Sequence, residues 1–271
     1  MIRAVNLAVR AGRHDLLRSV DLDVPTGSVT AIVGPNGSGK STLLRALTRA
    51  VKLADGRVEI DGVDVHTRNR RWIARKLGYV GQRQEPDPSL TVAEEIGLGA
   101  LAWSGGLLIG GRRLDVVVAD ALRTVGLQDR ALSRTGVLSG GELQRVALAR
   151  VLVQQSDHVL LDEPTNHLDP RHQLELLELL PRIADTAVVV LHDLDVAARV
   201  ADHVVVLDRG RVAAAGPPSV VLDARVLDDV YRVRTRVHAP PDDHTHFSFS
   251  LPRGQQAPPA PPAGQPERNH P

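Results

Sequence analysis

The chain has 271 residues, of which 42% are hydrophobic and 24% charged, which suits a soluble protein with one large α/β domain, with or without a subdomain. The formal net charge of +1 gives no electrostatic reason to bind nucleic acid, and the lack of cysteine excludes disulfides and thiolate metal sites. We expect no signal peptide and no apolar run long enough to span a bilayer, so any role at a membrane should depend on a partner.

The N-terminal part of the chain predicts β-structure. Residues 5–9 and 20–24 are short alternating or apolar runs, and a Pro-Thr-Gly turn at 25–27 leads into a third apolar run at 29–33. We expect an antiparallel β-rich edge that leads into a core sheet. Residues 56–62 are a further short strand with turns at both ends.

A phosphate-binding loop follows the third run. Residues 34–41 read Gly-Pro-Asn-Gly-Ser-Gly-Lys-Ser and match the pattern G-x-x-x-x-G-K-[ST]. They lie between a predicted buried strand and residues 42–47, whose leucine spacing predicts a helix with one buried face. The alternative, a glycine turn beside a surface lysine, is disfavoured by this strand–loop–helix context.

The residue types in the loop explain its chemistry. Glycine lets successive backbone N–H groups turn inward around phosphate oxygens, and the helix N-terminus adds a favourable dipole. We expect Lys40 to reach the β- and γ-phosphates and the Ser41 hydroxyl to ligate Mg²⁺. The predicted nucleotide-binding residues of the loop are Gly34, Pro35, Asn36, Gly37, Ser38, Gly39, Lys40, Ser41 and Thr42.

Helices and strands alternate along the rest of the chain. Residues 77–80 predict a strand that ends at Gln82, and residues 91–155 are predicted to be mostly helical, with a glycine-flanked apolar loop at 103–111. Three further buried strands are predicted at 159–164, 187–191 and 204–207, with a leucine-rich helix at 174–180. This alternation predicts an α/β fold with a parallel sheet covered on both faces.

Ligands bind beyond the carboxyl ends of the strands in such sheets. The candidate residues that follow strand ends are Gly34, Gln82, Asp162, Glu163 and His192. Although they are far apart in the sequence, we expect them to converge in space.

The order of these motifs resembles that of the ATP-binding subunit of an ABC transporter, over about residues 1–235. The motifs are the phosphate loop, Gln82 of the Q-loop, Leu138-Ser139-Gly140-Gly141 of the signature, Asp162-Glu163, Leu168-Asp169 of the D-loop and His192 of the switch. The signature distinguishes this family from other phosphate-loop enzymes, because those enzymes lack a Ser-Gly-Gly helix cap between the glycine loop and the strand that ends in acidic residues.

The resemblance implies a P-loop NTPase cassette: an α/β fold with a mixed core sheet, an antiparallel β edge and a helical subdomain at about 84–155. The cassette is expected to span residues 1–251. Residues 252–271 are rich in Pro, Gly and Gln and contain almost no large apolar side chain, so we expect this tail to be disordered.

The signature has a physical basis as well. Ser139 is a good N-cap, and Gly140 and Gly141 allow close approach to helix N–H groups that can bind an anion. The resemblance implies a head-to-tail pair of subunits, in which the signature of one copy faces the γ-phosphate held by the other and Asp169 aligns the two. The alternative for the signature residues is an ordinary capped helix.

The resemblance also implies catalytic roles. Glu163 is expected to orient and polarise the attacking water, and His192 to contact the γ-phosphate and hold Glu163; with Lys40, these are the predicted catalytic residues. Asp162, Ser41 and Gln82 are the predicted Mg²⁺ ligands. The alternatives are a solvated turn for the acid pair and a structural role for the histidine.

Two features depart from the family pattern. Glu142 stands where the family most often has Gln, as is frequent in relatives that import iron chelates. The family stacks adenine on an N-terminal aromatic residue, but no aromatic residue precedes Trp72 here. The guanidinium of Arg10 or Arg13 is the predicted replacement.

The predicted function is ATP hydrolysis that powers an importer for an iron siderophore, haem, cobalamin or a similar metal chelate. The predicted partners are a second copy of the chain, permease subunits received around residues 82–101 and, indirectly, an extracytoplasmic binding protein, at the cytoplasmic face of the membrane. No nucleic acid is expected. The alternatives are zinc or manganese import, a soluble ABC ATPase and a non-catalytic scaffold.

Histidines near the C-terminus are a last candidate. We assign no metal to His238, His244 and His246, because flexible polar flanks favour an exposed strand or tail.

Overall fold

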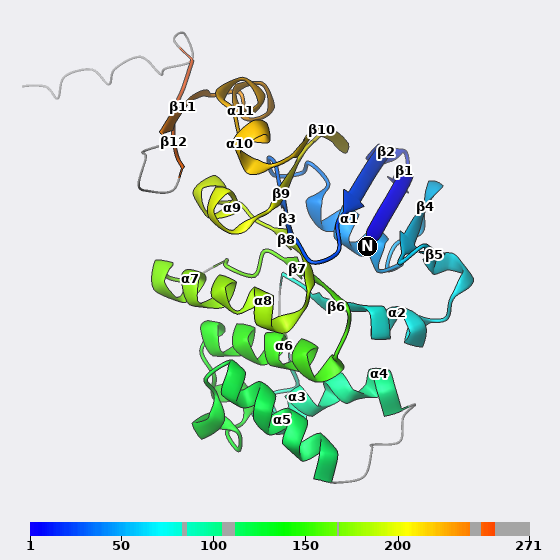
Figure 1. Ribbon diagram of the computed structural model, residues 1–271, viewed down its shortest axis with the longest axis vertical. Helices are drawn as coiled ribbons and strands as arrows, with labels where there is room; N and C mark the ends of the chain where they lie inside the picture. The colour runs from blue at the N-terminus through cyan, green and yellow to red at the C-terminus, as the bar shows by residue number, and fades with distance from the viewer. Residues whose placement is uncertain (83–85, 105–111, 167, 239–244, 253–271) are drawn as a thin grey trace, which may run out of the picture.

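The computed structural model describes residues 1–82, 86–104, 112–166, 168–238 and 245–252. Its central sheet has the strand order β10-β9-β3-β8-β7-β6, in which β10 runs antiparallel to β9 and the neighbouring pairs from β9 to β6 are parallel (Figure 1). The strands are β3 (Val29–Val33), β6 (Leu77–Val80), β7 (His158–Asp162), β8 (Thr186–Val190), β9 (His203–Asp208) and β10 (Arg211–Gly216). The predicted mixed core sheet is confirmed.

A second, antiparallel sheet has the order β2-β1-β4-β5. Its strands are β1 (Ile2–Ala11), β2 (His14–Val24), β4 (Asp55–Ile60) and β5 (Val63–Asp64). The predicted β edge is therefore a separate sheet. Helix α1 (Lys40–Leu47) packs between the two sheets, with Leu43, Leu44 and Leu47 fully buried in one apolar cluster that includes residues of both.

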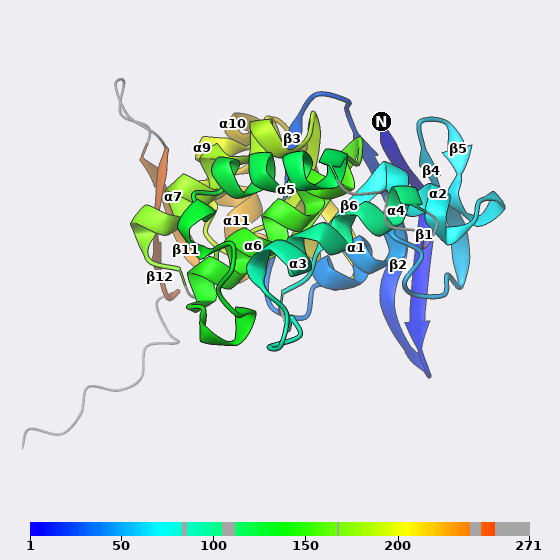
Figure 2. The ribbon, with the colours of Figure 1, turned by 90° about the horizontal axis from the view of Figure 1, so that it is seen from below.

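Most of the remaining helices pack on the other face of the central sheet, in a second apolar cluster, whereas α2 (Arg70–Lys76) joins the cluster of α1 through Ile73. The other helices between α2 and β7 are α3 (Val92–Gly97), α4 (Leu101–Ser104), α5 (Arg112–Thr124) and α6 (Gly140–Gln154). The helices that follow it are α7 (Pro170–Glu178), α8 (Leu180–Ile183), α9 (Leu194–Val200), α10 (Pro218–Val221) and α11 (Ala224–Tyr231). In Figure 1, α3 to α6 form a group below the central sheet and away from β1 and β2, and Figure 2, seen from below, shows this group in front. The expected helix-rich character of residues 91–155 is confirmed.

Some expectations need correction or fall outside the described residues. The predicted apolar loop at 103–111 begins as helix, because Trp103 and Ser104 end α4, and residues 105–111 lie outside the described part of the chain. A C-terminal hairpin, β11 (Arg234–His238) and β12 (His246–Ser250), precedes the predicted disordered tail, of which residues 253–271 also lie outside. Within the described residues, no helix is long and apolar enough to cross a bilayer.

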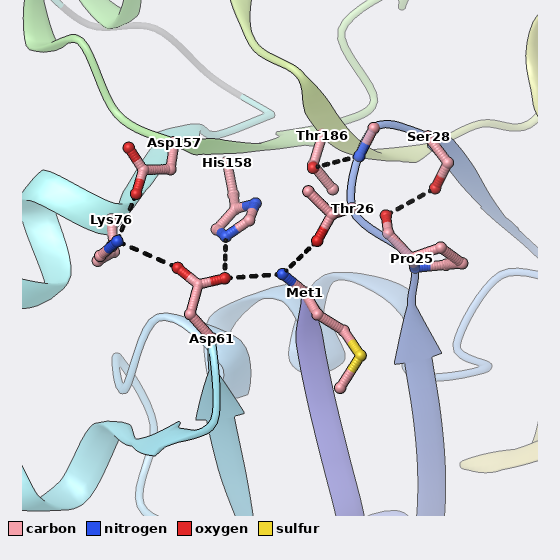
Figure 3. A network of polar contacts seen from close by, with 10 residues as sticks. Met1, Pro25, Thr26, Ser28, Asp61, Lys76, Asp157, His158 and Thr186 are labelled. Atoms are coloured by element: carbon pink, nitrogen blue, oxygen red, sulfur yellow. Dashed lines mark hydrogen bonds and ion pairs between the residues drawn. The ribbon is translucent and has the colours of Figure 1, made fainter.

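A polar network joins the two sheets (Figure 3). Asp61, in the turn after β4, accepts hydrogen bonds from the Met1 amino group at 2.7 Å and from Lys76 of α2 at 3.1 Å. Its carboxylate also lies 3.1 Å from Nε2 of the buried His158 on β7. Burial raises the pKa of the Asp61 carboxyl, but these three hydrogen bonds outweigh it and hold the pKa far below the ordinary Asp value.

We therefore expect Asp61→Asn to lower the free energy of unfolding in a pH-dependent way. A carboxyl whose pKa is depressed by folding stabilises the protein above the unfolded pKa, about 3.9, and loses that contribution as the pH falls. The difference between wild type and variant in urea unfolding should thus be full near neutral pH and shrink below about pH 4. Asp23→Asn, which removes an exposed partner of Arg3, is the control and should change little. A difference that stays constant down to acid pH would contradict this assignment.

Candidate functional site

The phosphate loop connects β3 to α1 at the carboxyl edge of the central sheet. Two of its glycines have a physical requirement. Gly34 has φ of 148°, and a Cβ there would lie 2.1 Å from the Leu207 carbonyl oxygen. Gly39 has φ of 106°, and a Cβ there would lie 2.9 Å from the Leu16 carbonyl oxygen. Both positions therefore need glycine to let the loop pack against its neighbours.

Lys40 turns back over its own loop. Its Nζ donates to the carbonyl oxygens of Gly34 at 2.7 Å and Pro35 at 3.1 Å, and the residue is only 5% exposed. Burial lowers the pKa of the Lys40 ammonium, and the nearby Glu163 and Asp162 carboxylates oppose that effect. A buried cation that is held by neutral carbonyl oxygens can exchange them for anionic oxygens. A phosphate group supplies such oxygens.

A hydroxyl and two carboxylates lie next to this lysine. Ser41 Oγ donates to Asp162 Oδ1 at 2.9 Å, and the Tyr79 hydroxyl approaches Oδ2 at 3.4 Å. Asp162 is fully buried, and burial is the main reason why the pKa of its carboxyl is raised. A buried carboxylate and a hydroxyl in contact, with no thiol or imidazole between them, form an oxygen donor set that fits Mg²⁺.

Glu163 lies at the centre of the site. Its carboxylate accepts from Gln82 Nε2 and Asn166 Nδ2, each at 2.5 Å, and lies 2.5 Å from His192 Nε2. The residue is 8% exposed and its φ of 55° is in the left-handed region, which is strained for a side chain of this size. Strain of this kind persists only where surrounding contacts fix it, so the fold holds this carboxylate in one position.

The structure thus brings together most of the predicted residues that follow strand ends. Gln82 follows β6, Asp162 ends β7 and Glu163 follows it, and His192 follows β8, as expected from the parallel strand order. The sequence did not predict Asn166, because a single side-chain amide three residues beyond the acid pair forms no periodic pattern. Its position shortly after Pro164, in a tight turn that returns to the acids, is the only sequence cue.

The signature residues occupy a different place. Ser139 N-caps α6, with its Oγ accepting from the Glu142 N–H at 3.3 Å, while Glu142 Oε2 accepts from the Ser139 N–H at 2.9 Å. A Cβ on Gly141 would lie 3.3 Å from Leu168 of the D-loop segment, and Asp169 N-caps α7 through the His172 N–H at 3.0 Å. Among the described residues, no hydrogen bond or ion pair joins Ser139, Gly140, Gly141 or Asp169 to the phosphate loop.

The remaining candidates lie apart from this cluster. Arg10 Nε lies 2.8 Å from Asp15 Oδ1 across the β1–β2 hairpin, and Arg13 is in the exposed turn of that hairpin. Adenine stacking by either stays a prediction. His238 and His246 are opposite each other in β11 and β12, and His244 lies outside the described residues.

Comparisons with known proteins show the family of this chain. The family model for ABC transporters matches residues 17–166. The hemin import ATP-binding protein HmuV of Streptomyces coelicolor is 42% identical over 234 residues, covering 84% of this chain and 82% of the relative. The ferric enterobactin transport ATP-binding protein FepC of Escherichia coli is 33% identical over 261 residues, covering 95% and 96%.

Solved structures of ATP-binding cassettes are also similar to this chain. The ATP-binding cassette MJ0796, a dimer in a post-hydrolysis state bound to ADP and Pi, is similar with a TM-score of 0.72 and 28% identity, covering 80% of this chain and 99% of that one. CbiO1 from Clostridium perfringens, part of the ABC transporter complex CbiONQ, has a TM-score of 0.74 and 27% identity, covering 84% and 92%.

The loop geometry yields a stability prediction. Gly34→Ala should lower the free energy of unfolding by more than the roughly 1–3 kcal/mol of local backbone strain, because its Cβ also meets the Leu207 carbonyl. Gly37→Ala is the matched control: its φ is 78°, but nothing lies within 4 Å of the added Cβ, so only about 1–2 kcal/mol is expected. Equal losses for both variants in urea unfolding would refute the packing argument.

Proposed function

The chain belongs to the ABC transporter family as an ATP-binding protein, an ATPase coupled to transport, and we propose that it powers an importer of ferric siderophores or haem. The observation that carries the catalytic part of the proposal is the Glu163 carboxylate, which is fixed by Gln82, Asn166 and His192 beside Lys40 and Asp162. Such a group suits a general base for an attacking water.

The proposed reaction is in-line attack of water on the γ-phosphorus of ATP, which breaks the bond to the β–γ bridging oxygen and releases ADP and phosphate. The loop N–H groups and Lys40 hold the phosphates, and the buried ammonium stabilises the charge that develops on their oxygens. Glu163 accepts the proton of the water at its carboxylate, and His192 keeps that carboxylate oriented. Ser41 and Asp162, together with Gln82, would hold Mg²⁺, which would supply positive charge to offset the charge of the phosphates.

A second copy of the chain completes the proposed site. The signature and the phosphate loop make no polar contact with each other within the described part of one chain, although both present helix N-termini suited to anions. A head-to-tail dimer would bring the signature of one copy to the γ-phosphate held by the other. The dimeric state of the related cassette MJ0796 supports this arrangement.

The proposed permease contact is on the helical side of the molecule. A groove of about 510 Å³ between α3 and α5 is lined mainly by apolar side chains, including Leu114, Val118 and Leu122. Leu98 and Leu101, at the end of the region predicted to receive the permease, are 40% and 48% exposed. An exposed apolar surface of this kind suits a partner helix, and we place the chain at the cytoplasmic face of the membrane through that contact.

The cargo proposal comes from the relatives. HmuV is named for hemin import and FepC for ferric enterobactin transport, and both match most of this chain. The cargo itself is not expected to contact this chain, because a binding protein and the permease would select it.

For catalysis, Glu163→Gln should lower ATP hydrolysis by about 10²–10⁴-fold, since an amide cannot take the proton of the water. Binding of ATP, measured by calorimetry, should persist, and sizing chromatography with saturating ATP should show a stabilised dimer. Glu175→Gln, which removes an exposed partner of Arg171, is the control and should hydrolyse ATP like wild type. Hydrolysis by Glu163→Gln at the wild-type rate would overturn the assigned role.

For cargo, the complex of this chain with its permease and binding protein, once these are identified by co-purification, should be assayed in liposomes. Ferric siderophore or hemin, loaded on the binding protein, is expected to raise the ATPase rate, whereas zinc and manganese should not. Stimulation by zinc or manganese alone would replace the cargo proposal. No co-purifying membrane protein at all would favour a soluble ABC ATPase instead.

A further inference from the structure

Three of the six aromatic residues of this chain gather at one place. The sequence has two Phe, two Tyr and two Trp, and both phenylalanines and Tyr231 line one open pocket of about 550 Å³. The other lining residues are His192, Asp193, Leu194, Asp195 and Val233. The pocket is therefore lined by both aromatic and acidic side chains, and it borders the histidine that contacts Glu163.

The C-terminal hairpin builds the aromatic side. Thr235 pairs with Phe249 and Val237 with Phe247, so these four side chains share one face of the hairpin. The Phe247 N–H donates to Asp195 Oδ1 of α9 at 2.8 Å, and the Thr235 N–H donates to Asp228 Oδ1 of α11 at 2.5 Å. The hairpin is thus tied to the rest of the fold, at its outer edge beside α11 (Figure 1).

Part of this apolar face has no cover within the described residues. Phe247 packs against the main apolar cluster, but Phe249 is 49% exposed and Leu251, just beyond the strand, is 53% exposed. Aromatic-lined grooves of this kind bind proline-rich segments, whose extended helix costs little entropy to order, and carboxylates beside them favour a ligand with a cation.

The next residues of the chain have this chemistry. Residues 258–262 read Pro-Pro-Ala-Pro-Pro, which contains two overlapping P-x-x-P patterns, and Arg253 precedes them. We propose that the prolines of residues 258–262 bind in this aromatic pocket against Tyr231, Phe247 and Phe249, while Arg253, in the tether, lies near the carboxylates of Asp193 and Asp195.

The covalent connection favours this occupant over others. Phe249 itself lines the pocket, so the segment leaves β12 at the rim, and the six residues 252–257 reach up to about 19 Å at about 3.1 Å per residue. A short tether gives an effective concentration of the order of millimolar. Even an interaction that is weak for a free peptide is then occupied within one chain.

The test uses the full chain, in which the lack of cysteine allows one label. Ala260→Cys with a nitroxide should cause loss of the amide NMR signals of Asp195, Phe247 and Phe249 through paramagnetic broadening. Signals at the β1–β2 turn should be unaffected. Replacing Pro258, Pro259, Pro261 and Pro262 by Ala in the labelled chain keeps the tether and should restore the signals.

Two further measurements make the outcome decisive. Phe249→Ala, a half-exposed position whose loss leaves the core intact, should also abolish broadening at Asp195 while the remaining spectrum is retained. Broadening that is equal in the four-alanine chain would show that the tether alone brings the label near and would overturn the proposal. Broadening in a mixture of isotope-labelled chains with separate nitroxide-labelled chains would assign the pocket to the segment of a second copy, which also overturns it.

Discussion

The fixed position of the Glu163 carboxylate is the interaction on which the rest of the site depends. Three side chains that follow or end different parts of the central sheet converge on it: Gln82 after β6, Asn166 after β7 and His192 after β8. They can do so only because β6, β7 and β8 are parallel, so that their carboxyl ends share one edge. The left-handed backbone at Glu163 is the local cost of aiming the carboxylate there.

The two-sheet architecture explains how the phosphate loop is held in place. Helix α1 is enclosed between the antiparallel sheet and the central sheet, and Leu43, Leu44 and Leu47 are fully buried there. The loop before it is packed against the Leu16 and Leu207 carbonyls through positions that accept only glycine. The Asp61 network ties the same two sheets together at another point. A preorganised anion site therefore comes from packing on both sides of one short helix.

The sequence predicted those parts of the site that are local and periodic. The strand–loop–helix around Lys40, the strand ending at Asp162 and the cap at Ser139 each depend on neighbouring residues, so pattern and spacing suffice. Asn166, the Asp61 network and the aromatic pocket of the C-terminal hairpin depend on residues distant in the sequence. Their side chains contact one another only in the folded chain, and no periodic sequence pattern indicates these contacts.

Glu142, which stands where the family most often has Gln, is part of the N-terminal cap of α6. An acidic side chain beside a proposed phosphate site should repel the ligand, but here its carboxylate accepts from the Ser139 N–H and hydroxyl and lies 3.3 Å from Arg130. The Ser139 N–H is the main cause of the lowered pKa of the Glu142 carboxyl, so the group stays ionised and committed to the cap. The N–H groups of Gly140 and Gly141, in the first turn of α6, have no partner within the helix. They keep the anion-binding capacity of the helix start, which makes the signature one half of a site that a second copy can complete.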